Sequence, residues 1–145
     1  MAPARAELMS AGDPLAVTPP AAALLGRTVL AADRERGVVE LGFTATRQFR
    51  NRMGNVQGGL LAAMLDSTLG CAAVAILPPP ASVMTLSMSV SFLRAAAPGE
   101  LRGHGRVRRR GRSIIFAEAE LRDASGAVVA TASGTMRVVR TEASS

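Results

Sequence analysis

One segment constrains the fold of this chain more than any other. Residues 60–77 are apolar except at three adjacent positions, the first of which is Asp66. Two glycines precede the segment, and three consecutive prolines follow it, where they stop a helix. We therefore expect a helix over about 58–77 that is buried on most sides. Such a helix must be enclosed, either by a lipid bilayer or by the rest of a folded domain.

We expect the helix to be enclosed by a folded domain rather than by a lipid bilayer. The segment approaches the ~20 residues that span a bilayer, but it is rich in Ala and Gly and carries Asp66 near its middle. A carboxylate at that depth costs about 2.5–3.5 kcal/mol on insertion. Residues 1–18 contain charges and lack the apolar run of a signal peptide. We expect a central helix wrapped by a sheet, no membrane insertion and a cytoplasmic location.

The rest of the chain is mostly strand-like. We expect a short helix within 19–26 and strands over 28–32, 37–46, 82–93, 100–110, 113–122 and 127–139. From Met84 to Phe92 every second residue is apolar, which predicts a strand with one buried face. Two strands, one long helix and four strands predict an α+β fold with an antiparallel sheet.

The length fits one domain. We assign it to residues 19–140, with a loose N-terminal extension over 1–18 and a tail over 141–145.

The composition narrows the possible chemistry. One cysteine, Cys71, excludes an internal disulfide, and one histidine, His104, argues against a zinc centre of the usual kind. We expect no metal and no cofactor. The net charge is +6 and fits an anionic partner. Tyr and Trp, which stack on bases, are absent, so we do not expect nucleic-acid binding.

The residues that can carry chemistry gather in 51–70. A lone carboxylate in an apolar helix, Asp66, is costly unless it has a partner or a chemical role, and partial burial makes it a better base. Gly58 opens the helix, where its N–H can stabilise negative charge on an oxygen. Together they favour hydrolysis of an activated acyl group. The alternative is structural, with a buried hydrogen bond at Asp66 and glycines that serve a tight turn.

The stretch NRMGNVQGGLLAAMLDSTLG also resembles the signature of PaaI-type hotdog-fold acyl-CoA thioesterases, N-x-x-G-x-x-H-G-G, six residues, then Asp. The matching positions are Asn51, Gly54, Gly58, Gly59 and Asp66. The similarity continues through 84–100 and 124–139, and it covers about 20–140. Gln57 departs from the pattern, which has His there.

The resemblance implies a hotdog fold, an antiparallel sheet around one long central helix. It implies that Asp66 activates water or attacks the thioester carbonyl. Asn51 and Gln57 would lie near that carbonyl, and Thr85 would hold the attacking water. Gln57 can donate a hydrogen bond but carries no proton at neutral pH. The family also implies a homodimer, often doubled to a homotetramer, in which Asp66 of one subunit faces Gly58 of the other.

Two further sets of residues are candidates for substrate binding. Gly59, Leu60, Leu61 and Met64 would line the acyl site, with no preference between aryl and medium-chain acyl groups. Arg106, Arg108 and Arg110 would contact the phosphates of coenzyme A, which is part of the substrate. On a regular strand these arginines share one face. The alternative is a solvated face, partly neutralised by glutamates of the next strand.

Two other functions remain open. Hotdog domains also occur as non-catalytic acyl-CoA-binding modules, but Asp66 is retained here and favours the enzyme. The other is a hotdog dehydratase or hydratase. For that chemistry the resemblance implies a paired Asp and His, and no histidine lies near Asp66 in the sequence.

Overall fold

The computed structural model describes residues 13–140, which form one antiparallel sheet and one long helix. The helices are α1 (Pro20–Leu24) and α2 (Gly58–Ala75). The strands are β1 (Thr28–Asp33), β2 (Val38–Ala45), β3 (Ser82–Phe92), β4 (Gly99–Arg110), β5 (Ile114–Arg122) and β6 (Val128–Val139). Short 3-10 turns cover Pro14–Ala16 and Arg47–Phe49. The sequence-predicted order of elements is confirmed.

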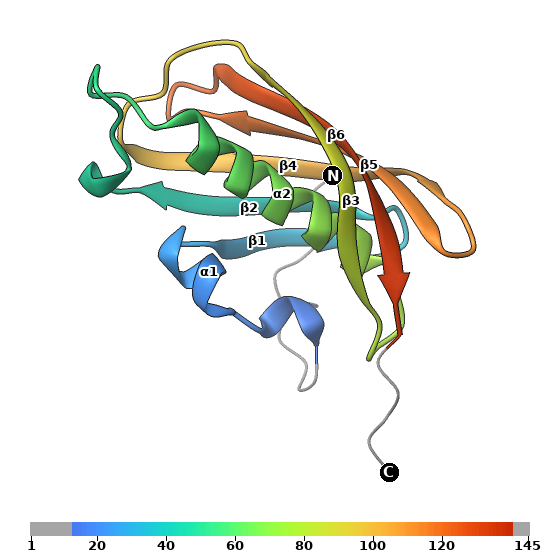
Figure 1. The fold of residues 1–145 in the computed structure, drawn as a ribbon. Coiled ribbons are helices and arrows are strands. Elements are labelled where there is room, and N and C mark those ends of the chain that lie inside the picture. The colour runs from blue at the N-terminus through green and yellow to red at the C-terminus, as the bar shows by residue number, and fades with distance from the viewer. Residues whose placement is uncertain (1–12, 141–145) are drawn as a thin grey trace.

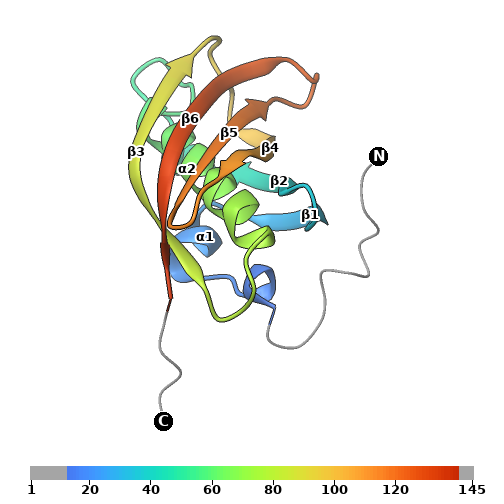
Figure 2. The ribbon, with the colours of Figure 1, turned by 90° about the vertical axis from the view of Figure 1, so that its right-hand side faces the viewer.

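The strands form a single six-stranded sheet in the order β1-β2-β4-β5-β6-β3, and every neighbouring pair is antiparallel. The sheet curves around α2, which lies in its concave side (Figures 1 and 2). This is the hotdog arrangement that the resemblance predicts. β1 and β3 are the two edges of the sheet, so β3 has a free side for pairing.

α2 supplies the central part of the core. Its buried residues face the sheet and include Leu61, Met64, Leu65, Thr68, Leu69 and Ala72. Among residues 13–140 it is the one helix long and apolar enough to cross a membrane, and half of it is buried inside the fold. Its apolar character is therefore explained by its place as the core helix.

Two glycines of β4 let α2 approach the sheet closely. A Cβ at Gly103 would lie 2.5 Å from Thr68 Oγ1, and one at Gly105 would lie 2.8 Å from the Thr68 carbonyl oxygen. The Thr68 hydroxyl meanwhile donates to the Met64 carbonyl at 2.8 Å. Side chains at the two glycine positions would push the helix away from the sheet.

A bulge changes the phase of β3. The register of β3 against β6 shifts between Thr85 and Ser87, so Leu86 is the inserted residue. Thr85 therefore faces α2 as Met88 does, although the two lie an odd number of positions apart. The single buried face predicted from Met84 to Phe92 is wrong at three of its five apolar positions, because Met84, Leu86 and Phe92 are 55%, 53% and 54% exposed.

A second bulge, between Val107 and Arg109, divides the arginine row of β4. Arg106 lies before the bulge, and Arg110 lies after it. Arg110 turns to the helix side and donates to the Ile76 carbonyl at 3.3 Å, just beyond the end of α2. The prediction that Arg106, Arg108 and Arg110 share one face is wrong for this reason.

The end of the expected N-terminal extension is packed rather than loose. Asp13 is buried, accepts a hydrogen bond from the Leu15 N–H and pairs with Arg34. The Leu15 side chain is buried in the core. Residues 13–18 therefore belong to the folded domain. The remainder of the expected extension and the tail 141–145 lie outside the described residues.

Candidate active site

The centre of the candidate site is a hydrogen bond between α2 and β3. The Thr85 hydroxyl donates to Asp66 Oδ1 at 2.6 Å, and both residues are half-buried. Residues 13–140 make no other hydrogen bond to the Asp66 carboxylate. Its Oδ2 has no partner among them, and it is not buried. Thr85 thus fixes one carboxylate oxygen and leaves the other open to solvent. The hydroxyl oxygen of Thr85 can also accept a hydrogen bond.

The N-terminus of α2 forms a second part of the site. The N–H groups of Leu60 and Leu61 donate back to the Gln57 carbonyl. The N–H groups of Gly58 and Gly59 precede them and have no acceptor within the described chain. The Phe92 ring lies close by, 3.3 Å from the position of a Cβ at Gly58. An oxygen that approaches Gly58 therefore meets a helix N-terminus beside an aromatic ring.

The loop before α2 is organised by Asn51. Its Oδ1 accepts hydrogen bonds from the N–H groups of Met53 and Asn55, at 2.9 and 3.1 Å. Gly54 has φ +85°, which completes the tight turn. This is the structural use of an asparagine oxygen, and it leaves the amide NH2 to donate elsewhere. A role for Asn51 at the substrate carbonyl stays a prediction.

Gln57 occupies the N-cap position of α2 and is exposed. Its backbone N–H donates to the Phe49 carbonyl at 2.8 Å, whereas its side chain makes no capping hydrogen bond. The backbone is thus fixed while the carboxamide is free to turn towards a ligand. Its predicted role as a hydrogen-bond donor is compatible with this geometry and remains a prediction.

One copy of the chain does not bring these parts together. Asp66 lies eight residues after Gly58, about 12 Å along the helix at 1.5 Å per residue. A single carbonyl cannot contact both groups at that separation.

Two residues expected in the acyl lining belong to the core instead. Leu61 is 3% exposed and Met64 is 0% exposed, since their helix positions point at the sheet. Leu60 is partly buried against the same core, and Gly59 is exposed at the start of α2. The sequence pattern did not separate the two sides of α2, because nearly every position of the helix is apolar.

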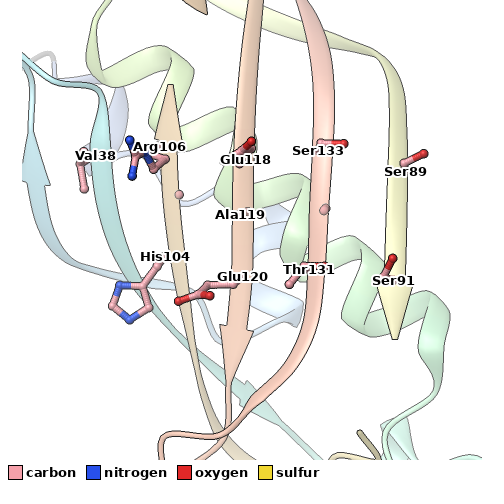
Figure 3. Close-up of a pocket in the computed structure, with 12 residues that line it drawn as sticks. Val38, Ser89, Ser91, His104, Arg106, Glu118, Ala119, Glu120, Thr131 and Ser133 are labelled. Carbon is pink, nitrogen blue, oxygen red and sulfur yellow. The ribbon is translucent and has the colours of Figure 1, made fainter. Parts of the chain in front are cut away.

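The face of the sheet turned away from α2 carries Arg106. Arg106 lies between Val38 and Glu118, and all three line a groove of about 550 Å³ (Figure 3). His104 and Glu120 lie in the next row, and serine and threonine hydroxyls of β3 and β6 complete the lining. Within one chain this groove is on the opposite side of the sheet from Asp66. The expected contacts of Arg106, Arg108 and Arg110 with coenzyme A remain a prediction.

Sequence reasoning missed a cavity lined by Ser67, which follows Asp66 on α2, and by Val83, two residues before Thr85 on β3. It has a volume of about 260 Å³ and lies between the N-terminal segment, α2 and the start of β3. Arg27, Ser67 and Ser82 are polar residues of its lining, and Leu15, Val17, Val74 and Val83 are among the apolar ones. Arg27 is one of 17 arginines and carries no motif, so only the folded structure reveals its place.

Cys71 lines the same cavity but is buried. Burial raises the pKa of the Cys71 thiol above its ordinary value, while the charge of Arg27 and a hydrogen bond with Ser67 act in the opposite direction. A protonated, buried thiol is a poor nucleophile, which argues against Cys71 as the catalytic nucleophile.

The fold defines a hotdog-type domain, and comparison with known proteins places it among the thioester hydrolases. Residues 53–130 match the family described as the thioesterase superfamily. A protein of Saccharolobus solfataricus, named only as a candidate esterase, is 31% identical over 79% of this chain and 79% of its own. A similarly named protein of Pseudomonas aeruginosa is 32% identical over 83% of this chain and 90% of its own.

Solved structures give the same result. A phenylacetic acid degradation-related protein from Ralstonia eutropha, titled a candidate thioesterase, has a TM-score of 0.80 and 43% identity. The alignment covers 84% of this chain and 92% of that protein. The Escherichia coli PaaI protein has a TM-score of 0.76 over 84% of this chain and 86% of its own, but at 21% identity it supports the fold alone. The chain belongs to the thioesterase superfamily and is a PaaI-type hotdog thioester hydrolase.

Proposed function

We propose that this thioesterase hydrolyses acyl-CoA thioesters to a free acid and coenzyme A. The observation that carries the proposal is the 2.6 Å hydrogen bond from Thr85 Oγ1 to Asp66 Oδ1. It holds a half-buried carboxylate in one orientation and leaves Oδ2 accessible. The same arrangement would not be needed for a domain that only binds its ligand.

The geometry supports a water-based reaction. A water that donates one hydrogen bond to Asp66 Oδ2 and another to Thr85 Oγ1 is held at two points. Asp66 takes a proton from this water as its oxygen attacks the thioester carbonyl. The carbonyl oxygen becomes an oxyanion, which the Gly58 N–H at the start of α2 stabilises. Collapse of the tetrahedral intermediate breaks the C–S bond and expels coenzyme A, whose sulfur takes the proton from Asp66. Direct attack by Asp66 on the carbonyl is the alternative route.

The complete site requires a second copy of the chain. Because Gly58 and Asp66 lie about 12 Å apart on one helix, the oxyanion donor must come from a partner whose α2 lies alongside. β3 offers the surface for this contact, since it is an edge strand on which Met84, Leu86 and Phe92 are more than half exposed, as is Leu93 directly after it. We propose a homodimer, or a tetramer made from two such dimers, located in the cytoplasm.

The test is hydrolysis of a panel of aryl- and medium-chain acyl-CoAs, followed by thiol release, with the wild-type protein and the Asp66→Asn variant. We expect Asp66→Asn to lose nearly all turnover while its melting temperature and oligomeric mass stay the same. Wild-type turnover by Asp66→Asn on the best substrate would remove Asp66 from the reaction. Tight binding of acyl-CoA without turnover by the wild-type protein would instead favour a non-catalytic binding module.

A further inference from the structure

Arg27 is a half-buried cation that makes two hydrogen bonds to neutral groups. One guanidinium nitrogen donates to Ser67 Oγ at 2.9 Å, and the other terminal nitrogen donates to the Val17 carbonyl at 3.0 Å. Among residues 13–140, no carboxylate lies within ion-pairing distance of Arg27. A guanidinium has five N–H donors, so several remain for a ligand. A half-buried charge in this state favours an anion as its neighbour.

The cavity in front of Arg27 neighbours the candidate active site along both α2 and β3. Ser67, which accepts the hydrogen bond from Arg27, directly follows Asp66 on α2. Val83 lies two residues before Thr85 on β3, and residues two apart on a strand point to the same face. The cavity lining therefore includes close neighbours of both Asp66 on α2 and Thr85 on β3, and it extends along α2 towards Val74.

The lining is partly apolar and partly polar. Leu15, Val17, Val74 and Val83 supply apolar walls, and Arg27, Ser67 and Ser82 supply polar groups. The apolar walls fit methylene groups, and the guanidinium fits a carboxylate, which it can bind through two parallel hydrogen bonds. A plain alkyl chain in this cavity would cover Arg27 without supplying an acceptor, which is unfavourable for a buried charge.

We propose that Arg27 is a specificity-determining residue that binds a carboxylate at the far end of the acyl group, so that the preferred substrates are thioesters of dicarboxylic acids. This inference rests on the proposed function of the Asp66–Thr85 site and narrows its substrate class. The phosphates of coenzyme A are another possible anion for Arg27, and the experiment separates the two.

The first measurement compares matched acyl-CoA pairs of equal chain length: succinyl with butyryl, glutaryl with pentanoyl, and adipoyl with hexanoyl. We expect the wild-type protein to hydrolyse at least one diacid thioester with a higher kcat/KM than its monoacid partner. Arg27→Gln should lower kcat/KM for that diacid by roughly tenfold to a hundredfold, the range for one charge-assisted hydrogen bond. It should change the monoacid value by less than threefold. Arg112→Gln, which removes an exposed arginine in the β4–β5 turn, is the control for loss of charge alone.

The same pairs carried on N-acetylcysteamine, which lacks phosphates, identify the anion. If Arg27 binds the acyl carboxylate, the preference for diacids and its loss in Arg27→Gln persist on this carrier. An equal loss on diacid and monoacid CoA thioesters that vanishes on N-acetylcysteamine would assign Arg27 to the phosphates and overturn the proposal. A second variant, Ser82→Asp, places a carboxylate in the cavity and should remove the diacid preference while the protein stays folded.

Binding separates a failure of this inference from a failure of the proposed function. In the Asp66→Asn background, calorimetry should show tighter binding of the diacid thioester, and Arg27→Gln should remove the difference. Arg27-dependent diacid binding by a wild-type protein that hydrolyses neither thioester would contradict the proposed function and support the inference. Hydrolysis of both thioesters without any Arg27-dependent preference would contradict the inference alone.

Discussion

Thr85 and Asp66 meet because β3 contains one inserted residue. The hydroxyl of Thr85 lies 2.6 Å from Asp66 Oδ1, and the bulge at Leu86 turns Thr85 towards α2. In a regular strand, Thr85 and the core residue Met88 would point to opposite faces. The bulge thus lets one edge strand contribute to the core at Met88 and to the site at Thr85.

Thr85→Val tests the hydroxyl of this pair, because valine keeps the shape and removes the hydrogen bond. We expect kcat to fall roughly tenfold to a thousandfold, the range for one lost group that orients or stabilises the reacting atoms. Thr85→Ser, which keeps the hydroxyl, should restore most of the activity. Equal turnover by Thr85→Val and the wild-type protein at saturating substrate would show that the hydroxyl has no part in the reaction.

Gln57 can be tested in two directions because its side chain is exposed and makes no cap. If it donates to the thioester carbonyl, Gln57→Ala should lower kcat by roughly tenfold to a thousandfold. Gln57→His should preserve or raise activity, and it would add a pH dependence near the imidazole pKa of about 6.5 if the new group carries a proton. A silent Gln57→Ala variant would leave the Gly58 N–H as the main oxyanion donor.

The oligomeric state follows from the separation of Gly58 and Asp66. We expect light scattering at micromolar concentration to give a multiple of the 15.0 kDa chain mass. Leu86→Arg places a charge on the exposed edge strand, so it should shift the mass towards that of one chain and lower turnover in parallel. A wild-type mass of one chain, with full activity, would refute a site shared between two copies.

Cys71 gives the protein a distinctive alkaline response. The sequence has no Tyr and all 17 of its basic residues are Arg, so the thiol is the side chain that titrates between about pH 9 and 12. Burial raises the pKa of the folded thiol above its ordinary 9.0. Above pH 9 the unfolded chain loses this proton and the folded chain keeps it, so the free energy of unfolding decreases as pH rises. For this single group the slope cannot exceed about 1.4 kcal/mol per pH unit.

Urea unfolding from pH 7.5 to 11, at fixed protein concentration, measures this slope. Below pH 9 both states hold the proton, and the contribution to stability is fully present. The Cys71→Ala variant lacks the group and should show little change over the same range. Parallel curves for the two proteins would mean that the thiol has the same pKa in both states.

Gly105→Ala probes the close contact between α2 and β4. A Cβ there would lie 2.8 Å from the Thr68 carbonyl oxygen, so we expect a loss of about 1–3 kcal/mol in the free energy of unfolding. The matched control is Gly70→Ala on α2, where a Cβ meets nothing within 4 Å. That variant should gain up to about 1 kcal/mol from the higher helix propensity of alanine. Chemical denaturation of both variants decides whether the strand position is special.

Much of the fold follows from local sequence patterns. The helix over 58–77 ends two residues earlier than expected, and the six strands match within a residue or two. The bulges were not predictable, because Leu86 and Arg108 continue the alternation of their strands in sequence and only the partner strand reveals the extra residue. The sequence predicts Asp66 and Thr85 as residues of the catalytic site, and the structure brings them into hydrogen-bond contact.

The sequence-based predictions that failed concern features that depend on tertiary contacts. The sequence predicts Leu61 and Met64 in the lining of the acyl site, but both are buried in the core. Because α2 is apolar all round, hydrophobicity alone could not show which side faces the sheet. Leu15 sits in a proline-rich segment without periodicity, and its burial depends on Asp13 and Arg34, which lie far apart in sequence. Arg27 has no neighbouring motif, and its place in the cavity arises from the packing of α2 against the N-terminal segment.

The glycines of β4 also explain how this chain forms a core with so few aromatic residues. It has four Phe and neither Trp nor Tyr. Since α2 rests almost directly on the backbone at Gly103 and Gly105, the space between helix and sheet is thin, and alanine, valine, leucine and methionine are large enough to fill it. Larger residues at these positions would have to be accompanied by larger side chains elsewhere in the core. They would also lift α2, and the carboxylate of Asp66 would move relative to Thr85. The depth of the core and the geometry of the Asp66–Thr85 pair therefore both depend on these two glycine positions.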